Sequence, residues 1–322
     1  MRLRLVAFGL LLAGCAAQGD AKAPAFHLIP GQIPADKGPD GNTIVLDAPQ
    51  GLIVVDTGRH PEHSAAILAY AHERGRPIAA IINSHWHLDH TTGNYDIRQV
   101  YPHAEVYATN AVNGALATFL KDSRAQTDIM LADPKTPQAT RDQLLRGRSV
   151  IDHPDRLRPT RPVLKSARMT IAGRMLDVRV APFAATEADL WFYDPKEKLA
   201  LVGDLVVAIV PFMDTACPDG WAKALDAIVK MPFTTLIPGH GDPMTKADFL
   251  QWRNAYNNLL ACARSAADKK ACVAGWDRDA ARFIDAPHKA YVDAALDYYI
   301  DSRLRSSPEE QQHYCKPLVA GT

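Results

Sequence analysis

Apolar residues along the chain fall into short β-branched runs that alternate with stretches of helical spacing. Residues 42–48 (NTIVLDA) and 51–58 (GLIVVDTG) are two such runs separated by a short turn, which predicts a hairpin. Residues 62–74 have helical spacing, and residues 77–84 (PIAAIINS) form a continuous apolar run that predicts a buried strand. The first part of the chain therefore predicts strands and helices in alternation.

A second β-rich block covers residues 169–206, and a predicted helix at 219–230 and a strand at 234–238 follow it. Between the two blocks, residues 110–160 are polar and interrupted by four prolines, which predicts a helical insertion over one face. Two β-rich halves, each with helices, predict an α/β fold of the αββα sandwich type.

The ends of the chain differ from this middle part. Residues 16–41 are rich in Ala, Pro and Gly, which is typical of a tether, and the chain is mostly helical from Met244 onward. The predicted division is a signal segment at 1–15, a tether at 16–41, a main domain at 42–245 with the insertion at 110–160, and a helical C-terminal extension at 246–322.

Composition and charge narrow the possible partners. Of the 322 residues, 47% are hydrophobic and 22% are charged, which is ordinary for a globular protein. The 36 Lys and Arg residues balance the 36 Asp and Glu residues, so the chain has no general basic field for nucleic acid. We therefore expect a small-molecule substrate and no nucleic-acid partner.

The first fifteen residues, MRLRLVAFGLLLAGC, predict export. Two arginines precede an apolar stretch at 5–13 that is too short to span a bilayer as a permanent helix. The stretch ends in LAGC, which resembles a bacterial lipobox, so Cys15 is the predicted site of lipidation. Ala16 in place of Asp favours the outer membrane by analogy with enteric bacteria. The alternative is a secretory signal cleaved near Ala16 or Ala17, and the lipobox favours a periplasmic, lipid-anchored protein.

Export also bears on the cysteines. Without Cys15, an even number of cysteines remains for an oxidising compartment. Cys262 and Cys272 flank a polar turn between two helical stretches, which predicts a disulfide that joins a helix hairpin. A Cys217–Cys315 pair is the second prediction, and four free buried thiols are the alternative.

Four potential metal ligands occur within six residues. In INSHWHLDHTTGN (81–93), His85, His87, Asp89 and His90 directly follow the predicted buried strand. Zinc in proteins takes such nitrogen and oxygen ligands. A lone pair of histidines is more often structural, but four ligand types at the end of a strand favour a metal site.

The stretch HWHLDH matches the HxHxDH signature of the metallo-β-lactamase-fold hydrolases, and the resemblance covers about residues 40–245. It implies that His85, His87, Asp89 and His90 bind metal. It also implies that Asp56 (in VVDTG) supports the histidine loop, that Asp204 (in ALVGDLV) bridges two metal sites and that His240 (in LIPGHGDP) is the last ligand. The surroundings of these residues resemble the glyoxalase II-like branch, which includes exported proteins associated with quinoprotein oxidation systems.

One position departs from the family pattern. Ala185, in APFAATEADLWFY, stands where the family has the third histidine of its first metal site. The resemblance therefore implies a complete second site and a weakened first site, with one zinc bound tightly and a second bound more weakly. Residues that could replace the missing ligand are His60, His63, His153 and Glu187, although each is more simply explained without a metal.

Two hypotheses of function follow from the resemblance. The first is an exported zinc-dependent hydrolase that acts on a small ester, thioester, lactone or lactam through a metal-bound hydroxide. In this hypothesis Asp89 has two roles: it binds metal and it orients the hydroxide. The second is a non-catalytic metal-binding sensor or assembly protein, which Ala185 favours. Trp86 and the 211–213 stretch (PFM) are either walls of the substrate cleft or ordinary core.

Lipid anchoring through Cys15 can be tested by fractionation. The Cys15→Ser variant should become soluble or remain uncleaved, because the residue that carries the lipid is lost. Membrane association and processing equal to those of the unmodified protein would rule out the anchor.

Overall fold

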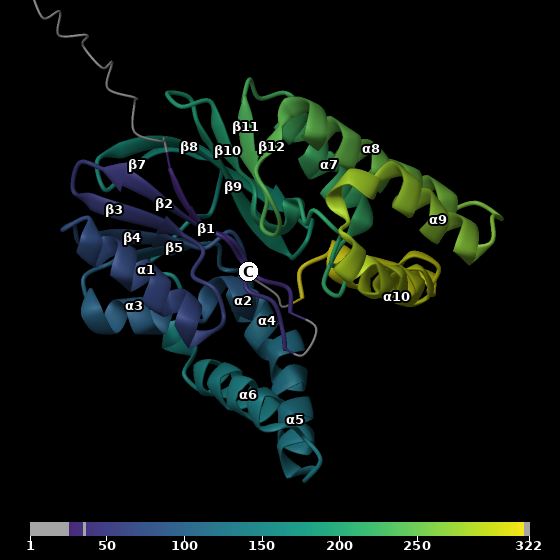
Figure 1. Ribbon diagram of the computed structural model, residues 1–322, viewed down its shortest axis with the longest axis horizontal. Helices are drawn as coiled ribbons and strands as arrows, with labels where there is room; N and C mark the ends of the chain where they lie inside the picture. Colours follow the sequence, from purple (N-terminus) through teal and green to yellow (C-terminus); the bar gives the residue numbers. More distant parts are fainter. Residues whose placement is uncertain (1–25, 35–36, 319–322) are drawn as a thin grey trace, which may run out of the picture.

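Two sheets pack face to face, and helices cover both outer sides (Figure 1). The computed structural model describes residues 26–34 and 37–318. The arrangement confirms the predicted αββα sandwich with a helical insertion and a C-terminal helical extension. Cys15 and the whole predicted signal segment lie outside the described residues.

Each sheet has six strands. In spatial order, the first sheet contains β1 (His27–Ile29), β2 (Thr43–Ala48), β3 (Gly51–Val55), β4 (Ile78–Ile82), β5 (Glu105–Ala108) and β6 (Arg161–Pro162). The second contains β12 (Met244–Thr245), β11 (Thr235–Ile237), β10 (Leu199–Leu201), β9 (Ala188–Asp194), β8 (Arg174–Pro182) and β7 (Ala167–Ile171).

The predicted hairpin at 42–58 is present as β2 and β3, and its register divides apolar residues between two cores. Ile44 pairs with Val55, and both cluster with residues of the second sheet. Val45 pairs with Val54, and both cluster with Ile67 of α1 (Pro61–Glu73) on the opposite side. This division follows from the two-residue period of a strand. The second sheet contributes to the central core Val178, Leu190, Phe192, Leu199, Leu201 and Ile237.

Part of the predicted tether is ordered as a strand. Residues 27–29 pair antiparallel with Thr43–Val45, and the ring of His27 stacks on Tyr70 with centroids 3.8 Å apart. These contacts hold β1 at the edge of the first sheet, so the sheet begins earlier in the chain than the sequence pattern suggested.

The helical layers have recognisable start signals. Pro61 begins α1, where its fixed φ and missing N–H cost nothing. At the start of α8 (Lys246–Ala263), Thr245 and Asp248 form a capping box, in which the side chain of each residue accepts a hydrogen bond from the backbone N–H of the other. The fully buried indole of Trp252 donates to the carbonyl oxygen of Val207 at 2.9 Å, which ties α8 to the second sheet's loops. The outer layers are α1 (Pro61–Glu73) and α3 (Asn94–Val100) on the first sheet, and α7 (Pro218–Val229) and α8 (Lys246–Ala263) on the second.

The predicted insertion and extension are both helical. The insertion contains α4 (Ala111–Ala117), α5 (Phe119–Ala132) and α6 (Gln138–Ile151), and α5 and α6 project away from the sheets (Figure 1). The extension continues from α8 through α9 (Lys269–Asp279), α10 (Lys289–Tyr299), the π-helical turn η5 (Ile300–Leu304) and α11 (Pro308–Gln312). Shorter helical segments are α2 (Leu88–Thr91), η1 (Pro154–Arg156), η2 (Gly203–Leu205), η3 (Ala281–Phe283), η4 (Ala286–His288) and η6 (His313–Cys315).

Within the predicted helical extension, the helix that begins at Lys289 is interrupted after Tyr299. A backbone bond from Arg305 N–H to the carbonyl oxygen of Ile300 closes a π-helical turn. This turn keeps Ile300 buried while Arg303 donates to the carbonyl oxygens of Met213 and Ala216. Over the part of the chain that the structure describes, no helix combines the length and apolarity needed to cross a bilayer.

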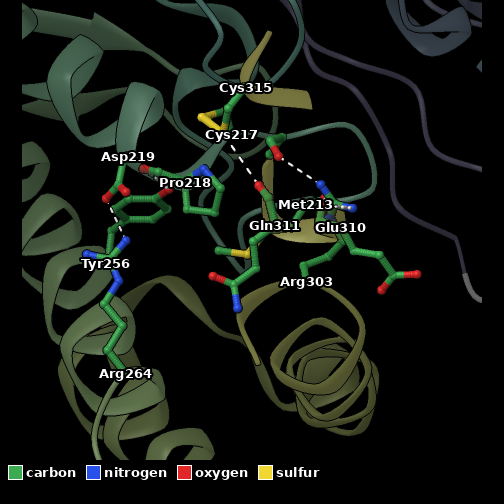
Figure 2. The surroundings of a disulfide bond; sticks show 11 residues. Met213, Cys217, Pro218, Asp219, Tyr256, Arg264, Arg303, Glu310, Gln311 and Cys315 are labelled. Atoms are coloured by element: carbon green, nitrogen blue, oxygen red, sulfur yellow. Dashed lines mark hydrogen bonds and ion pairs between the residues drawn. A yellow bond between two sulfur atoms is a disulfide. The ribbon is translucent and has the colours of Figure 1, made fainter. Parts of the chain in front are cut away.

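Both predicted disulfides are present, so the alternative of four free thiols is wrong. Cys262 and Cys272 join the end of α8 to α9. Cys217, which directly precedes α7, is bonded to Cys315 in η6, and 98 positions separate the two cysteines in the sequence (Figure 2). Together with Arg303, the second bond holds the 211–217 loop against the C-terminal extension.

Loss of the long-range disulfide should destabilise the protein more than loss of the local one. Replacing Cys217 and Cys315 by Ser should lower the free energy of unfolding by about 2–5 kcal/mol, the usual cost of removing a native disulfide. Urea denaturation of the oxidised proteins measures this change. The matched control is the Cys262→Ser, Cys272→Ser pair, which closes a separation of only 10 residues. Equal losses for both pairs would contradict the expected dependence on loop length.

Candidate metal centre

The predicted ligands converge because they follow parallel strands. The histidine loop follows β4, which runs parallel to β3, and Asp56 directly follows β3. In the second sheet, Asp204 follows β10 and His240 follows β11, which is parallel to β10. Residues just beyond the carboxyl ends of parallel strands meet at one edge of a sheet. All six predicted metal ligands and Asp56 therefore lie together.

One set of ligand atoms is especially compact. Asp89, His90 and His240, here called the His90 group, each place one ligand atom within 4.8 Å of the others. His240 Nε2 lies 3.2 Å from Asp89 Oδ2, and His90 Nε2 lies 3.3 Å from His240 Nε2. Asp204 adds an oxygen, since its Oδ1 lies 3.1 Å from His90 Nε2 and 3.4 Å from His240 Nε2.

The other set shares Asp204. His85, His87 and Asp204, here called the His85 group, also have ligand atoms within 4.8 Å of one another. Asp204 Oδ2 lies 3.7 Å from His85 Nε2, so the two oxygens of this carboxylate face the two groups. Gly239 permits this approach, because a Cβ there would lie 2.1 Å from Asp204 Oδ1.

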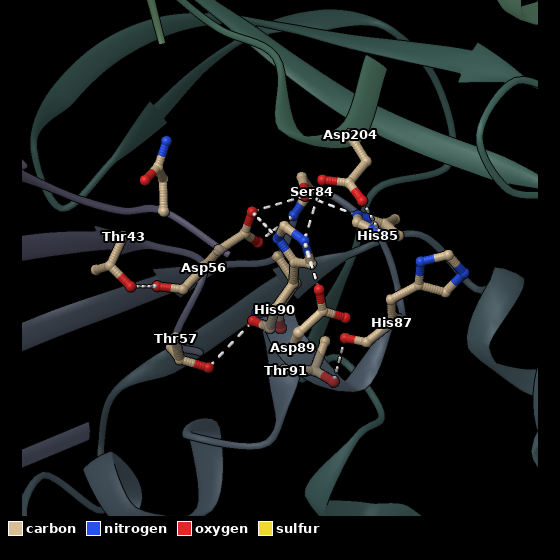
Figure 3. A network of polar contacts seen from close by, with 12 residues as sticks. Thr43, Asp56, Thr57, Ser84, His85, His87, Asp89, His90, Thr91 and Asp204 are labelled. Atoms are coloured by element: carbon tan, nitrogen blue, oxygen red, sulfur yellow. Dashed lines mark hydrogen bonds and ion pairs between the residues drawn. The ribbon is translucent and has the colours of Figure 1, made fainter. Parts of the chain in front are cut away.

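Asp56 connects the histidine loop to β3 (Figure 3). Its carboxylate accepts hydrogen bonds from the Ser84 N–H and hydroxyl, both at 2.7 Å, and lies 2.9 Å from His90 Nδ1. The Ser84 hydroxyl also lies 2.9 Å from His85 Nδ1. Because that hydroxyl donates to Asp56, it accepts from His85, and Nε2 of both imidazoles is left to face the ligand groups. Asp56 has a φ of 57°, an uncommon conformation for a residue with a side chain.

Ala185 lies beside the His85 group. The hydroxyl of Thr215 donates to the carbonyl oxygen of Ala185 at 3.0 Å and lies 2.9 Å from His87 Nε2. It therefore accepts from His87, which leaves Nδ1 of that ring as the available ligand atom. Thr215 thus links the backbone of Ala185 to His87, and the side chain of Ala185 is fully buried.

The buried polar atoms suit a cation. His85 Nε2 and both carboxylate oxygens of Asp204 are buried without a hydrogen-bond partner among the described residues. Burial opposes a charge on Asp204, but His90 and His240 hold the pKa of that carboxyl well below its usual range. Burial likewise opposes a charge on His90, but the carboxylates of Asp204, Asp56 and Asp89 raise its pKa well above its usual range. A divalent cation would satisfy this concentration of negative charge in place of a proton.

The residues considered as replacements for the third histidine have other surroundings. His60 pairs with Asp40 at 2.7 Å, and His63 bonds to Thr43 at the same distance. His153 bonds to a backbone oxygen in the insertion. Neither these three nor Glu187 belongs to a ligand group in the described part of the chain.

A pocket of about 320 Å³ opens onto the ligand groups, and both His87 and Asp89 line it. Both interpretations of Trp86 hold: its side chain lines the pocket, and it also packs on Phe119 in a buried apolar cluster. From the 211–213 stretch, Phe212 lines the pocket and contacts the ring of His240 edge-on, whereas Met213 is fully buried core. The remaining lining residues are Pro39, Arg59, Leu88, Phe119, Leu120, Ser123, Asp214, Tyr291 and Tyr299.

Three residues of the site were missed in the sequence. Ser84 directly precedes the histidine signature, so its position alone was a usable signal. Arg59 follows the DTG turn, and its Nη2 lies 3.5 Å from Asp89 Oδ1. Thr215 is 128 positions from His87, and nothing in its local sequence indicates the contact.

Comparison with known proteins agrees with this geometry. A sequence model described as "Metallo-beta-lactamase superfamily" matches residues 37–240, which is more than half of the chain. The chain belongs to the metallo-beta-lactamase superfamily. The glyoxalase II-like branch stays a prediction.

Among curated proteins, a linear primary-alkylsulfatase from Pseudomonas sp. (strain ATCC 19151) is 42% identical over 50 residues, which are 15% of this chain and 10% of that protein. The lactamase-like protein notP from Aspergillus sp. (strain MF297-2) is 36% identical over 63 residues, which are 19% of this chain and 20% of that protein. The chain thus spans only a small part of the curated relatives that it matches.

Two solved structures share the fold. The stereoselective inverting sec-alkylsulfatase Pisa1 from Pseudomonas sp. has a TM-score of 0.55 at 20% identity, over 80% of this chain and 47% of that one. A metallo-beta-lactamase family protein from Thermus thermophilus has a TM-score of 0.54 at 19% identity, over 87% of this chain and 94% of that one.

The two ligand groups should differ in metal affinity. The His90 group has three ligands plus Asp204, whereas the His85 group has two histidines and the same Asp204. Because loss of a residue that merely supports a ligand costs about 10–100-fold in metal affinity, loss of a ligand should cost at least that. Metal analysis after mild chelation should find close to one zinc ion held tightly, and a second only at raised concentration.

Variants separate the two groups. Ala185→His should give two tightly bound ions, His85→Ala should lose only the weaker ion, and His240→Ala should lose the tighter one. Two tight ions in the unmodified protein would show that the missing ligand had been replaced, and an unchanged count in all three variants would refute the assignment.

Proposed function

We propose that the protein is an exported, zinc-dependent hydrolase that acts on a small ester, thioester, lactone or lactam. The observation that carries this proposal is that two ligand groups share Asp204 and that each group supplies one residue, His87 or Asp89, to the lining of a largely apolar pocket. Membership of a superfamily that contains hydrolases supports it. The leader sequence that ends at Cys15 supports export and lipid anchoring in the periplasm.

The residues present fit a bound metal ion. The His90 group with Asp204 would hold the tighter ion, and the His85 group with Asp204 the weaker one. A divalent ion held there supplies Lewis acidity towards a carbonyl oxygen and lowers the pKa of a water molecule towards neutrality. Asp89 lines the pocket as well as joining the His90 group, so its second oxygen is placed to orient the attacking water.

The pocket walls indicate what the rest of the substrate would be. Aromatic side chains of Trp86, Phe119 and Phe212 surround the approach to the ligand groups, which favours an apolar acyl or aryl substituent. Arg59 is the only Lys or Arg among the described lining residues. Because Arg59 lines the pocket beside Asp89, its guanidinium can donate to a developing negative charge on the substrate.

A sulfate ester with an alkyl substituent is the second candidate substrate. Similarity to alkylsulfatases in a short sequence match and in the fold supports it, as does Arg59, because a guanidinium pairs well with an oxyanion. One observation supports the alternative of a non-catalytic metal-binding protein: Ala185 stands in place of the third histidine.

A substrate panel tests the proposal. The zinc-loaded protein should hydrolyse at least one of a 4-nitrophenyl ester, an aryl thioester, a lactone, a β-lactam and a decyl sulfate. Asp89→Asn should reduce that rate by at least about 100-fold, the lower range of what a group that positions or transfers a proton contributes. Asp155→Asn, which changes an exposed carboxylate in the insertion, is the matched control and should leave the rate unchanged.

The outcomes separate the two functions. Turnover that depends on Asp89 supports a hydrolase, and its substrate distinguishes carboxylic from sulfate esters. Tight zinc binding without turnover of any panel member, or equal residual rates for the two Asp variants, would reject the hydrolase and favour the metal-binding alternative.

A further inference from the structure

A second cavity lies away from the ligand groups. It measures about 400 Å³ and is lined by residues of α7 and of strands β8 and β9, on the side of the second sheet that α7 covers. None of its lining residues lines the pocket at the metal centre. Its size falls in the range of small-molecule sites, which is about 300–1,000 Å³.

The floor of this groove is apolar. Trp191 and Ala181 contribute from the strands, and Ala224 and Ala227 contribute from α7. The two alanines are three positions apart, so they share one face of the helix, and their small side chains leave the space above the sheet open. Met231 closes one end. These residues provide an apolar surface but nothing that would select a polar ligand.

The rim is basic. Arg179, Lys223 and Lys230 line the groove, and no Asp or Glu does. Lys223 and Lys230 are seven positions apart and flank the two alanines along α7. No hydrogen bond or ion pair of either lysine side chain is present among the described residues.

Arg179 is only loosely engaged. Within the part of the chain that the structure describes, its one carboxylate contact is Asp177 Oδ2, 3.9 Å from a terminal nitrogen, and its Nε is buried without a hydrogen-bond partner. Ser166, also at the rim, accepts a hydrogen bond from the Val180 N–H, so its own hydroxyl proton is available to an anion. In a chain with no net charge, three cations around one apolar groove form a local positive field.

We propose that this groove binds a small anionic amphiphile, an alkyl chain with a sulfonate, sulfate or carboxylate head. The chain would lie on Trp191 between α7 and the sheet, and the head would pair with the three cations and the Ser166 hydroxyl. Charge complementarity selects the anion, and the apolar floor selects the tail. The proposal is independent of the metal centre and of the proposed hydrolysis.

Decane-1-sulfonate is a suitable probe, since it has no hydrolysable ester bond. Calorimetry on the full chain below the micelle concentration should show one saturable site. Decyltrimethylammonium, with the same tail and the opposite charge, should bind at least about tenfold more weakly. The double variant Lys223→Glu, Lys230→Glu should lose decanesulfonate affinity by about tenfold or more, because two attractive charges become repulsive.

Further variants locate the site. Ala227→Trp should abolish binding by filling the groove from an exposed helix position. Lys270→Glu, at an exposed position of α9, is a control for charge reversal away from the groove and should bind like the unmodified protein. Trp191→Phe should remove most of the change in tryptophan fluorescence that accompanies binding.

Three results would overturn the proposal. Equal binding of the two probes would show nonspecific adsorption of the tail. Binding that survives Ala227→Trp but is lost in Arg59→Gln would place the probe in the pocket at the metal centre. A dimer in sedimentation that dissociates in the double variant, without probe binding, would show that a second copy of the chain covers the groove.

Discussion

The metal centre depends on the carboxylate of Asp56. This one group joins the end of β3 to the loop after β4, through Ser84, and fixes the ring of His90 at the same time. Through the Ser84 hydroxyl it also determines which nitrogen of His85 carries the proton. A carboxylate that accepts from a backbone N–H, a hydroxyl and an imidazole holds three partners in one geometry. The positive φ of Asp56 is the local conformational cost of placing that carboxylate between two strands.

Asp204 has the complementary role from the other sheet. Its two oxygens face two different ligand groups, and neither forms a hydrogen bond within the described residues. The site is therefore assembled only when the two sheets pack, because each sheet supplies a part that cannot gather the ligands alone. The central core, in which Ile44 and Val55 meet residues such as Phe192, gives that packing its stability.

The sequence predicted those parts of the protein that depend on neighbouring residues. Short β-branched runs on either side of a turn predicted the β2–β3 hairpin, and helical spacing predicted α1. The histidine signature gave the ligands, because four of them lie within six positions. Contacts between distant segments were not predictable in this way. The bond of Thr215 to His87 and the position of Arg59 beside Asp89 exist only once the loops have been brought together. The π-helical turn after α10 was also missed, because its apolar pattern is the same as that of an ordinary helix.

The Cys217–Cys315 disulfide and Arg303 fasten the 211–217 loop to the C-terminal extension, and Tyr299 adds a hydrogen bond to Asp214. Phe212, Asp214, Tyr291 and Tyr299 all line the pocket at the metal centre, and the two tyrosines come from the extension itself. The extension lies beyond the segment that matches the family. The residues that would bind metal and the residues that shape the space for a substrate are thus encoded in different stretches of the chain. Selectivity can diverge here through changes in the extension, while the ligand set is left untouched.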